Sequence, residues 1–296
     1  MLASEIGALG EGVWRDHPQK FVGNSMLPLL SARGDAADES FVDGMAPTPE
    51  LLRCPYLLQV LSSFGAVLGR TRLMRLAGQA EVSPHVDGSY YWAERVRVHV
   101  PIVTQPTVRF VCGGATINMQ EGECWIFDTW REHKVYNEAN EQRIHLVADT
   151  VGGGDFWSLV DHGRPHDASP AGWQARHVVP SASPIAPPLV CERYNFPRIM
   201  SPWEMQHHLQ GFNGDVVEQQ SEVAVQARIA CLRLARTWRG LWARYGDSGE
   251  GFDAYRAALQ AFLDELPHDV ERLGLLNGTP WYRAVVAVVL KSAVRD

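Results

Sequence analysis

Between residues 71 and 149 the chain consists of short runs in which apolar and polar positions alternate. Gly, Asn, Asp and Glu turn segments separate these runs, so each run is predicted to be a β-strand. The runs are TRLMRL (71–76), RVRVHVPI (95–102), TVRFVC (107–112), ATINM (115–119), ECWIFD (123–128), HKVYN (133–137) and RIHLVAD (143–149). Many short strands at this spacing are typical of an all-β sandwich or barrel, so we expect a mainly β core.

Helical patterns flank this strand-rich region. The first 65 residues contain few alternating runs, but Thr48-Pro49 is a helix-start signal and residues 55–64 are predicted to be helical. In SPWE (201–204), Ser at the N-cap, Pro at the first helical position and Glu two residues later predict another helix start. Further helices are expected over residues 217–245, over residues 252–266 and after Thr279-Pro280.

A proline-rich stretch separates the strands from the carboxyl-terminal helices. It has little periodicity, which predicts an extended connector. Its prolines are Pro165, Pro170, Pro180, Pro184, Pro187, Pro188 and Pro197. We therefore expect three parts: a β domain with an amino-terminal helical approach over 1–162, the connector over 163–198, and a helical region over 199–296.

Composition narrows the classes of function. A formal net charge of -7 argues against a nucleic-acid binder, which needs clustered Lys and Arg. There is no run of eighteen uncharged apolar residues and no basic segment leading into an apolar one at the amino terminus, so we expect a cytoplasmic protein without membrane association. Five cysteines without CxxC spacing predict buried thiols rather than disulfides or a thiolate zinc site.

Candidate metal ligands occur at two places in the strand-rich region. His85-Val86-Asp87 follows a Gly-containing turn, and both side chains of such an H-x-D can project to one face. Alone this motif is weak, because a surface turn with a solvated His has the same pattern. His133 begins another strand-like run 48 residues downstream, and Arg143 follows it by ten. Two His and one Asp make a facial triad that suits Fe(II), and Arg143 offers a bidentate fork for the far carboxylate of a 2-oxo acid.

The alternation of apolar and polar residues within two strands gives separate support for a site that holds a ligand. In RIHLVAD, Ile144, Leu146 and Ala148 fall on one face, and Arg143, His145 and Val147 fall on the other. In RVRVHVPI, Val96, Val98 and Val100 alternate with Arg95, Arg97 and His99. A half-exposed strand with solvated arginines fits each strand taken alone. Together with the metal motif, the pattern favours a barrel whose interior is polar and holds a ligand.

These motifs resemble the aspartyl/asparaginyl β-hydroxylase-like branch of the 2-oxoglutarate oxygenases, which includes bacterial hydroxylases of free amino acids such as proline. The resemblance runs from about Leu73 to Asp149, roughly a quarter of the chain, with a weaker similarity in FVGNSMLPLLSARGD (21–35). The matching segments, in the family's order, are RLAGQAEVSPHVDG, RVRVHVPI, MQEGECWIFD, HKVYN and RIHLVAD.

The resemblance implies a double-stranded β-helix of the jelly-roll or cupin-like type. It implies His85 and His133 as iron ligands, Arg143 at the far carboxylate of 2-oxoglutarate, and Arg97 and His99 near the other end of that cosubstrate. Here Asp87 completes the triad. Relatives that act on aspartyl or asparaginyl side chains in proteins lack this carboxylate, so its presence favours the small-molecule branch.

Other residues have two open interpretations. His145 and Asn137 are candidates for orienting ligands, but a satisfied histidine of a β-barrel fits His145 as well. Tyr90, Tyr91 and Trp92 follow the metal motif and are candidates for a substrate wall, as are Trp125 and Trp130, although core packing is preferred for Trp125. The helical spacing of Trp238, Leu241, Trp242 and Tyr245 indicates core or dimer contacts.

The sequence thus predicts an oxygenase that uses Fe(II), 2-oxoglutarate and O2, with ascorbate as a candidate reductant, to hydroxylate an unactivated C–H bond of a free amino acid or small derivative. His85, Asp87 and His133 are the predicted metal ligands and catalytic residues. One alternative is hydroxylation of a peptide or protein side chain, and another is a non-catalytic cupin-like metal-binding protein. A homodimer through the carboxyl-terminal helices is a further expectation.

Overall fold

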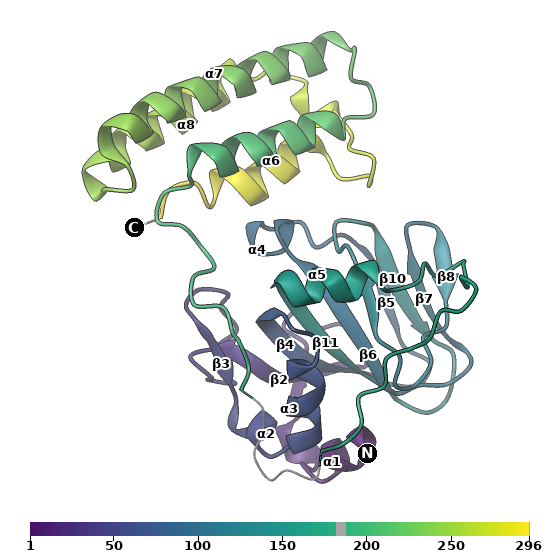
Figure 1. Ribbon diagram of the computed structural model, residues 1–296. Coiled ribbons are helices and arrows are strands. Elements are labelled where there is room, and N and C mark those ends of the chain that lie inside the picture. Colours follow the sequence, from purple (N-terminus) through teal and green to yellow (C-terminus); the bar gives the residue numbers. More distant parts are fainter. Residues whose placement is uncertain (182–187, 296) are drawn as a thin grey trace. The chain divides into compact units, whose positions relative to one another are not determined.

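The structure is a computed structural model that describes residues 1–181 and 188–295 (Figure 1). The chain divides into two compact units: Met1–His85 with Glu94–Asn195, and Val86–Ala93 with Phe196–Asp296. Pro184 and Pro187 of the expected connector lie outside the described residues.

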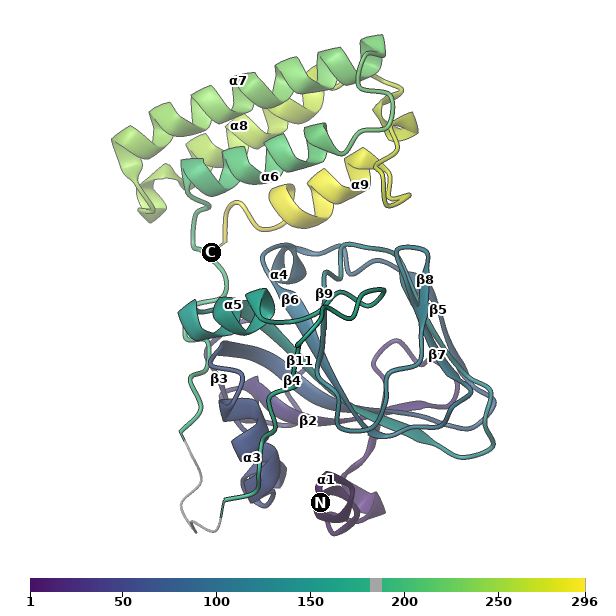
Figure 2. The ribbon, with the colours of Figure 1, turned by 45° about the vertical axis from the view of Figure 1, so that its right-hand side comes forward.

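Two antiparallel sheets form the first unit. The large sheet has the order β1 (Arg15–Asp16), β2 (Asn24–Ala32), β4 (Val67–Leu76), β11 (Arg143–Gly152), β6 (Val96–Val103) and β9 (Trp125–Phe127), with β3 (Met45–Pro47) paired to β2. The small sheet has the order β5 (Glu81–His85), β10 (His133–Asn137), β7 (Val108–Cys112) and β8 (Ala115–Ile117). Figure 2 shows the two sheets facing each other.

The path of the chain between the sheets defines the fold. β4, β6, β9 and β11 lie in the large sheet, whereas β5, β7, β8 and β10 lie in the small one, so the chain repeatedly crosses between them. This winding of two antiparallel sheets around a common interior is a double-stranded β-helix. β1, β2 and β3 extend the large sheet beyond β4. The predicted mainly β, cupin-like core with helical extensions is therefore confirmed.

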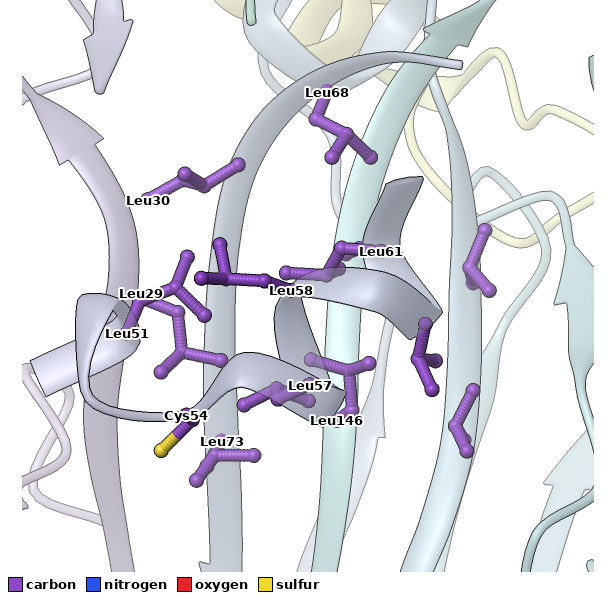
Figure 3. Close-up of a cluster of buried hydrophobic side chains, with 14 of the residues drawn as sticks. Leu29, Leu30, Leu51, Cys54, Leu57, Leu58, Leu61, Leu68, Leu73 and Leu146 are labelled. Carbon is purple, nitrogen blue, oxygen red and sulfur yellow. The ribbon is translucent and has the colours of Figure 1, made fainter. Parts of the chain in front are cut away.

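Short helices cover the outer face of the large sheet. They are α1 (Leu2–Gly7), α2 (Pro49–Leu52), α3 (Pro55–Ser62) and α5 (Gly154–Asp161), with a 3-10 turn η1 (Glu11–Val13) after α1. One hydrophobic cluster joins α1, α3 and α5 to β2, β4, β6 and β11. Figure 3 shows Leu57, Leu58 and Leu61 of α3 packed among leucines of the sheet. Burial of each such leucine stabilises the fold by about 1.5–3 kcal/mol, so this face fixes the strands that carry the site.

The turn between β4 and β5 packs tightly against the loop before β11. A side chain at Gly78 would lie 2.0 Å from the carbonyl oxygen of Asn140, so only glycine permits this approach. The Asn137 side-chain amide donates to Leu76 O, Ala77 O and Glu141 O. These bonds hold the end of β4 to the loop that leads into Arg143, which gives Asn137 a structural role.

The second unit is helical. It comprises α4 (Tyr90–Ala93), α6 (Pro202–Gly214), α7 (Glu222–Tyr245), η2 (Gly249–Gly251), α8 (Phe252–Glu265), η3 (Val270–Arg272), α9 (Trp281–Val285) and the π-helix η4 (Val286–Leu290). α7 packs along α8 and α6, and α6 also contacts α9. Trp238 is fully buried, its ring centroid lies 4.5 Å from that of Tyr255 in a tilted arrangement, and its indole N–H donates to Met200 O at 2.7 Å. Core packing, as predicted, explains Trp238.

Most elements agree with their sequence predictions, and the differences have physical causes. Thr48 and Ser201 accept the capping hydrogen bonds from Leu51 N and Glu204 N, as the helix-start signals predict. β2 was not predicted, because almost every residue in it is buried, so no alternation marks it, and Pro28 interrupts it. α5 was not predicted either; it starts after Gly152 and Gly153, which both have positive φ.

Two further expectations concern thiols and membranes. All five cysteines are free thiols; Cys54 and Cys231 are buried as expected, Cys112 and Cys191 are half-buried, and Cys124 is exposed. Within the described residues, every helix is too short or too polar to cross a membrane.

Candidate functional site

Two predicted ligands, His85 and His133, lie opposite each other on neighbouring strands. His85 ends β5, His133 begins β10, and the antiparallel register pairs them directly. Side chains of directly paired residues project from the same face of a sheet, and here the ring centroids are 4.3 Å apart. The β5–β10 pairing thus joins two imidazoles that are far apart in the sequence.

Both histidines are held in the same tautomer. His85 Nδ1 lies 2.8 Å from Ser83 O, and His133 Nδ1 lies 2.9 Å from Arg131 O. A carbonyl oxygen only accepts, so each Nδ1 carries the hydrogen and donates it. In a neutral imidazole the lone pair is then on Nε2, which is the atom that a metal would bind. The local backbone therefore presets both rings as ligands.

Asp87 follows His85 by two residues along the chain. One ligand atom from each of His85, Asp87 and His133 lies within 4.8 Å of the other two. Two imidazoles and one carboxylate occupy one face of an octahedral ion and leave three positions for other ligands. The structure thus brings the predicted trio together, and the chemistry of the donors fits a divalent transition metal.

The inner face of the large sheet, which faces the small sheet, carries buried charged and polar side chains. Arg97 and His99 of β6 and Arg143, His145 and Asp149 of β11 are all buried. The intervening residues belong to the hydrophobic cluster on the outer face: Val98, Val100, Ile144, Leu146 and Ala148. The predicted alternation in both strands is confirmed, and the polar side faces the interior.

Arg97 of β6 and Arg95, which lies just before β6, both have carboxylate partners. Arg97 pairs with Asp149, which lies opposite it on β11; Nε–Oδ1 is 2.7 Å and the second guanidinium nitrogen is 3.3 Å from Oδ2. Arg95 pairs with the buried Glu192 at 2.7 Å, and burial raises the pKa of Glu192. Sequence reasoning missed Asp149 as the partner of Arg97. Its signal was its place on the inward face of RIHLVAD, in register with β6.

Arg143 differs from Arg95 and Arg97. The residue is 3% exposed, and burial lowers the pKa of its guanidinium to about 9, so it stays charged at neutral pH. One terminal nitrogen lies 2.7 Å from His145 Nδ1, while the buried Nε has no hydrogen-bond partner. Among the described residues, no carboxylate pairs with Arg143. A buried cation without an anion is costly, so this guanidinium is suited to an anionic ligand.

A line of aromatic and imidazole rings connects the histidine pair to Arg143. The Phe127 ring is 5.3 Å from the His133 ring and 5.1 Å from the His99 ring, and His99 is 5.7 Å from His145. Burial first, and then the charge of Arg143, lower the pKa of His99 far below its usual value. His99 is therefore neutral, and it shares one interior region of the first unit with His133, His145 and Arg143.

The predicted aromatic residues separate into two groups. Tyr90 and Tyr91 are buried in the second unit, where their rings are 4.9 and 6.4 Å from that of Phe196. Both belong to a packed core, and their role in the wall of a substrate site stays a prediction. Trp125 packs against the hydrophobic cluster between the sheets, as its preferred interpretation predicts.

Comparison with known proteins supports the family but gives no detail of substrate. Residues 40–152 match the family model described as aspartyl/asparaginyl β-hydroxylase, which includes every candidate site residue. A search of curated proteins finds no match.

Solved structures with some likeness to the chain include enzymes of several kinds. A 2OG-Fe(II) oxygenase family oxidoreductase from Burkholderia pseudomallei is 14% identical over 52% of this chain and 80% of its own, with a TM-score of 0.35. A predicted oxalate decarboxylase from Thermotoga maritima is 12% identical over 46% and 89%, with a TM-score of 0.29. A cupin-superfamily sugar phosphate isomerase from Silicibacter pomeroyi is 19% identical over 47% and 68%, with a TM-score of 0.27.

TM-scores this low carry no assignment, so the fold rests on the strand order and the similarity to the family on the sequence match. That match spans the strands that carry the histidine pair and Arg143. Residues 40–152 of this chain are therefore similar to the aspartyl/asparaginyl β-hydroxylase family.

Proposed function

We propose that this protein is an Fe(II)- and 2-oxoglutarate-dependent dioxygenase that hydroxylates an unactivated C–H bond of a free amino acid or small amino-acid derivative. The observation that carries the proposal is Arg143, a buried guanidinium without a carboxylate partner among the described residues, in the same interior as a preset histidine pair. A 2-oxo dicarboxylate is the ligand that would bridge a metal and such a cation.

The proposed metal ligands are His85, Asp87 and His133. Their tautomers and spacing support this role, because both Nε2 atoms carry lone pairs and the carboxylate lies close to them. Fe(II) bound there would supply the redox chemistry that allows dioxygen to attack a C–H bond. The protein's part is to hold three ligands on one face and leave the opposite positions for the cosubstrate and oxygen.

Arg143 is the proposed partner of the distal carboxylate of 2-oxoglutarate. A charge-assisted fork in a buried setting binds a carboxylate more strongly than a neutral donor does. Arg97 and His99 are proposed to lie near the other end of the cosubstrate. The ion pair with Asp149 fixes the Arg97 guanidinium, so its position is set before any ligand binds.

The substrate class rests on Asp87. Relatives that hydroxylate protein side chains lack this carboxylate, so its presence here supports a small-molecule substrate. Hydroxylation of a peptide or protein side chain is the alternative, and the helical second unit would then be a docking surface. The non-catalytic, cupin-like metal-binding alternative is disfavoured by Arg143, because a purely structural metal has no need of a buried unpaired cation nearby.

The experiment is a screen for succinate formed from 2-oxoglutarate by the Fe(II)-loaded protein, with each amino acid added in turn and ascorbate present. We expect one or a few amino acids to raise succinate formation well above the uncoupled rate. Stimulation only by peptides or proteins would support the alternative substrate class. Absence of succinate under every condition, together with a tightly bound redox-inert metal, would refute the oxygenase proposal.

A further inference from the structure

His145 lies between Arg143 and His99 on the inner face of the large sheet. The residue is 1% exposed, its Nδ1 is 2.7 Å from a terminal nitrogen of Arg143, and its ring centroid is 5.7 Å from that of His99. The residues in register with it are Met74 on β4 and Pro101 on β6, and neither side chain offers a strong acceptor.

The contact with Arg143 determines the protonation of the imidazole. A guanidinium has only donors, so Nδ1 of His145 must accept, and the ring hydrogen of the neutral form is on Nε2. Burial first, then the charges of Arg143 and His99, lower the pKa of His145 far below its usual value. The ring is therefore neutral, with an acceptor toward Arg143 and a donor at Nε2.

The Nε2 donor has no hydrogen-bond partner within the part of the chain that the structure describes. A buried donor left without a partner costs free energy, and such groups are rare in folded proteins. Contacts among the described residues alone therefore do not make His145 a satisfied histidine of a β-barrel, and the role of orienting a ligand is favoured. Two unsatisfied donors, Arg143 Nε and His145 Nε2, occur on adjacent inward positions of β11.

We infer that His145 is a positioning and selectivity residue for the cosubstrate, whose Nδ1 orients the Arg143 guanidinium and whose Nε2–H donates to the same distal carboxylate. This inference rests on the proposed function. Its specific consequence is that β11 selects a 2-oxo acid by a second carboxylate, using one charged donor and one neutral donor.

The test compares two ligands that differ only at the distal end. 2-Oxoglutarate and 2-oxopentanoate are titrated by calorimetry into the Mn(II)-loaded full-length protein, so no turnover is needed. His145→Phe should weaken 2-oxoglutarate about tenfold or more, the range expected for a lost hydrogen bond to a charged group, and leave 2-oxopentanoate within about twofold. The ratio of the two dissociation constants separates a role at the carboxylate from a general loss of structure.

Two amide variants separate the two nitrogens of the ring. His145→Asn keeps an acceptor near Nδ1, and His145→Gln keeps a donor near Nε2, so each should retain selectivity between that of the wild type and that of His145→Phe. Both amides are polar, so these two variants still provide the test if His145→Phe does not fold. His166→Phe, at an exposed histidine of the same unit, is the matched control and should bind as the wild type does.

Equal weakening of both ligands in all three variants, or an unchanged selectivity ratio, would overturn the role of His145. In that case wild-type binding of 2-oxoglutarate and its loss in Arg143→Gln would leave the proposed function standing. Failure of the wild type to bind 2-oxoglutarate at all would refute the proposed function itself, and this inference with it.

Discussion

His133 on β10 lies directly opposite His85 on β5, and both rings donate Nδ1–H to the carbonyl oxygen two residues earlier in the chain. The same local arrangement thus occurs twice, once on each of two neighbouring strands. The register of the small sheet and these two hydrogen bonds to the backbone set the geometry of the two imidazoles. A metal would meet imidazoles that are already oriented, which reduces the reorganisation needed on binding.

Loss of a ligand should abolish metal binding without unfolding the protein. His85→Ala and His133→Ala each remove one imidazole from a preset pair, and Asp87→Gly removes the charged ligand. Iron content after loading and desalting should fall to near zero for both histidine variants and by most of its value for Asp87→Gly. Circular dichroism should stay close to that of the metal-free wild type. His166→Ala is the control, and retained turnover in either histidine variant would contradict the assignment.

Replacement of Arg143 should affect the cosubstrate selectively. Arg143→Gln exchanges a charged fork for a neutral amide, so the 2-oxoglutarate concentration for half-maximal succinate formation should rise at least about tenfold. The requirement for the prime substrate should change far less. Arg109→Gln, on the exposed face of β7, provides the matched loss of an arginine. If the 2-oxoglutarate requirement is unchanged, Arg97 becomes the next candidate.

The Arg97–Asp149 pair should be important for stability. Asp149→Leu leaves a buried guanidinium without its anion, which typically costs about 3–5 kcal/mol. Chemical denaturation of the metal-free protein measures this loss. Glu138→Gln breaks the exposed pair with Arg109 and should cost no more than about 1 kcal/mol. Equal costs for the two variants would show that burial does not set the strength of the inner pair.

A buried histidine of the second unit should make stability depend on pH. Burial, and then the charge of His207, lower the pKa of His208 to about 4 from an ordinary value of 6.5. Between these values the unfolded chain binds a proton that the folded chain does not, so stability falls as pH falls from 6.5 toward 4. The slope approaches about 1.4 kcal/mol per pH unit for one proton.

His208→Phe removes this proton and places a ring beside those of Tyr90 and Phe212. Urea unfolding at pH 7.5, 6 and 5 should show a flatter dependence than in the wild type. His268→Phe, at an exposed position of the same unit, should keep the wild-type dependence. A parallel pH dependence in His208→Phe and wild type would show that His208 does not titrate in this range.

The sequence predicted what local patterns determine. Alternation marked the strands that carry Arg97, His99, His133 and Arg143, and capping residues marked the helix starts at Thr48 and Ser201. The motif spacing indicated a metal trio, whose ligand atoms the structure places close together.

The contacts that the sequence did not predict join residues that are far apart in the chain. The partnership of Arg97 with Asp149 follows from the β6–β11 register, which the chain order does not specify. The burial of Tyr90 and Tyr91 in the helical unit likewise depends on long-range packing against Phe196. The three-part domain division, the dimer through the carboxyl-terminal helices and the cytoplasmic location stay predictions.

The most direct measurement of the central claim is the mass of the products formed under labelled dioxygen. As the proposed third ligand, Asp87 would fill a coordination position that a halide would otherwise need, so hydroxylation is the expected outcome even at high chloride. With 18O2, 2-oxoglutarate and the amino acid identified by the screen, we predict one labelled oxygen in the hydroxylated product and one in succinate. A product without label, or a chlorinated or desaturated main product, would contradict the assignment as a hydroxylating dioxygenase.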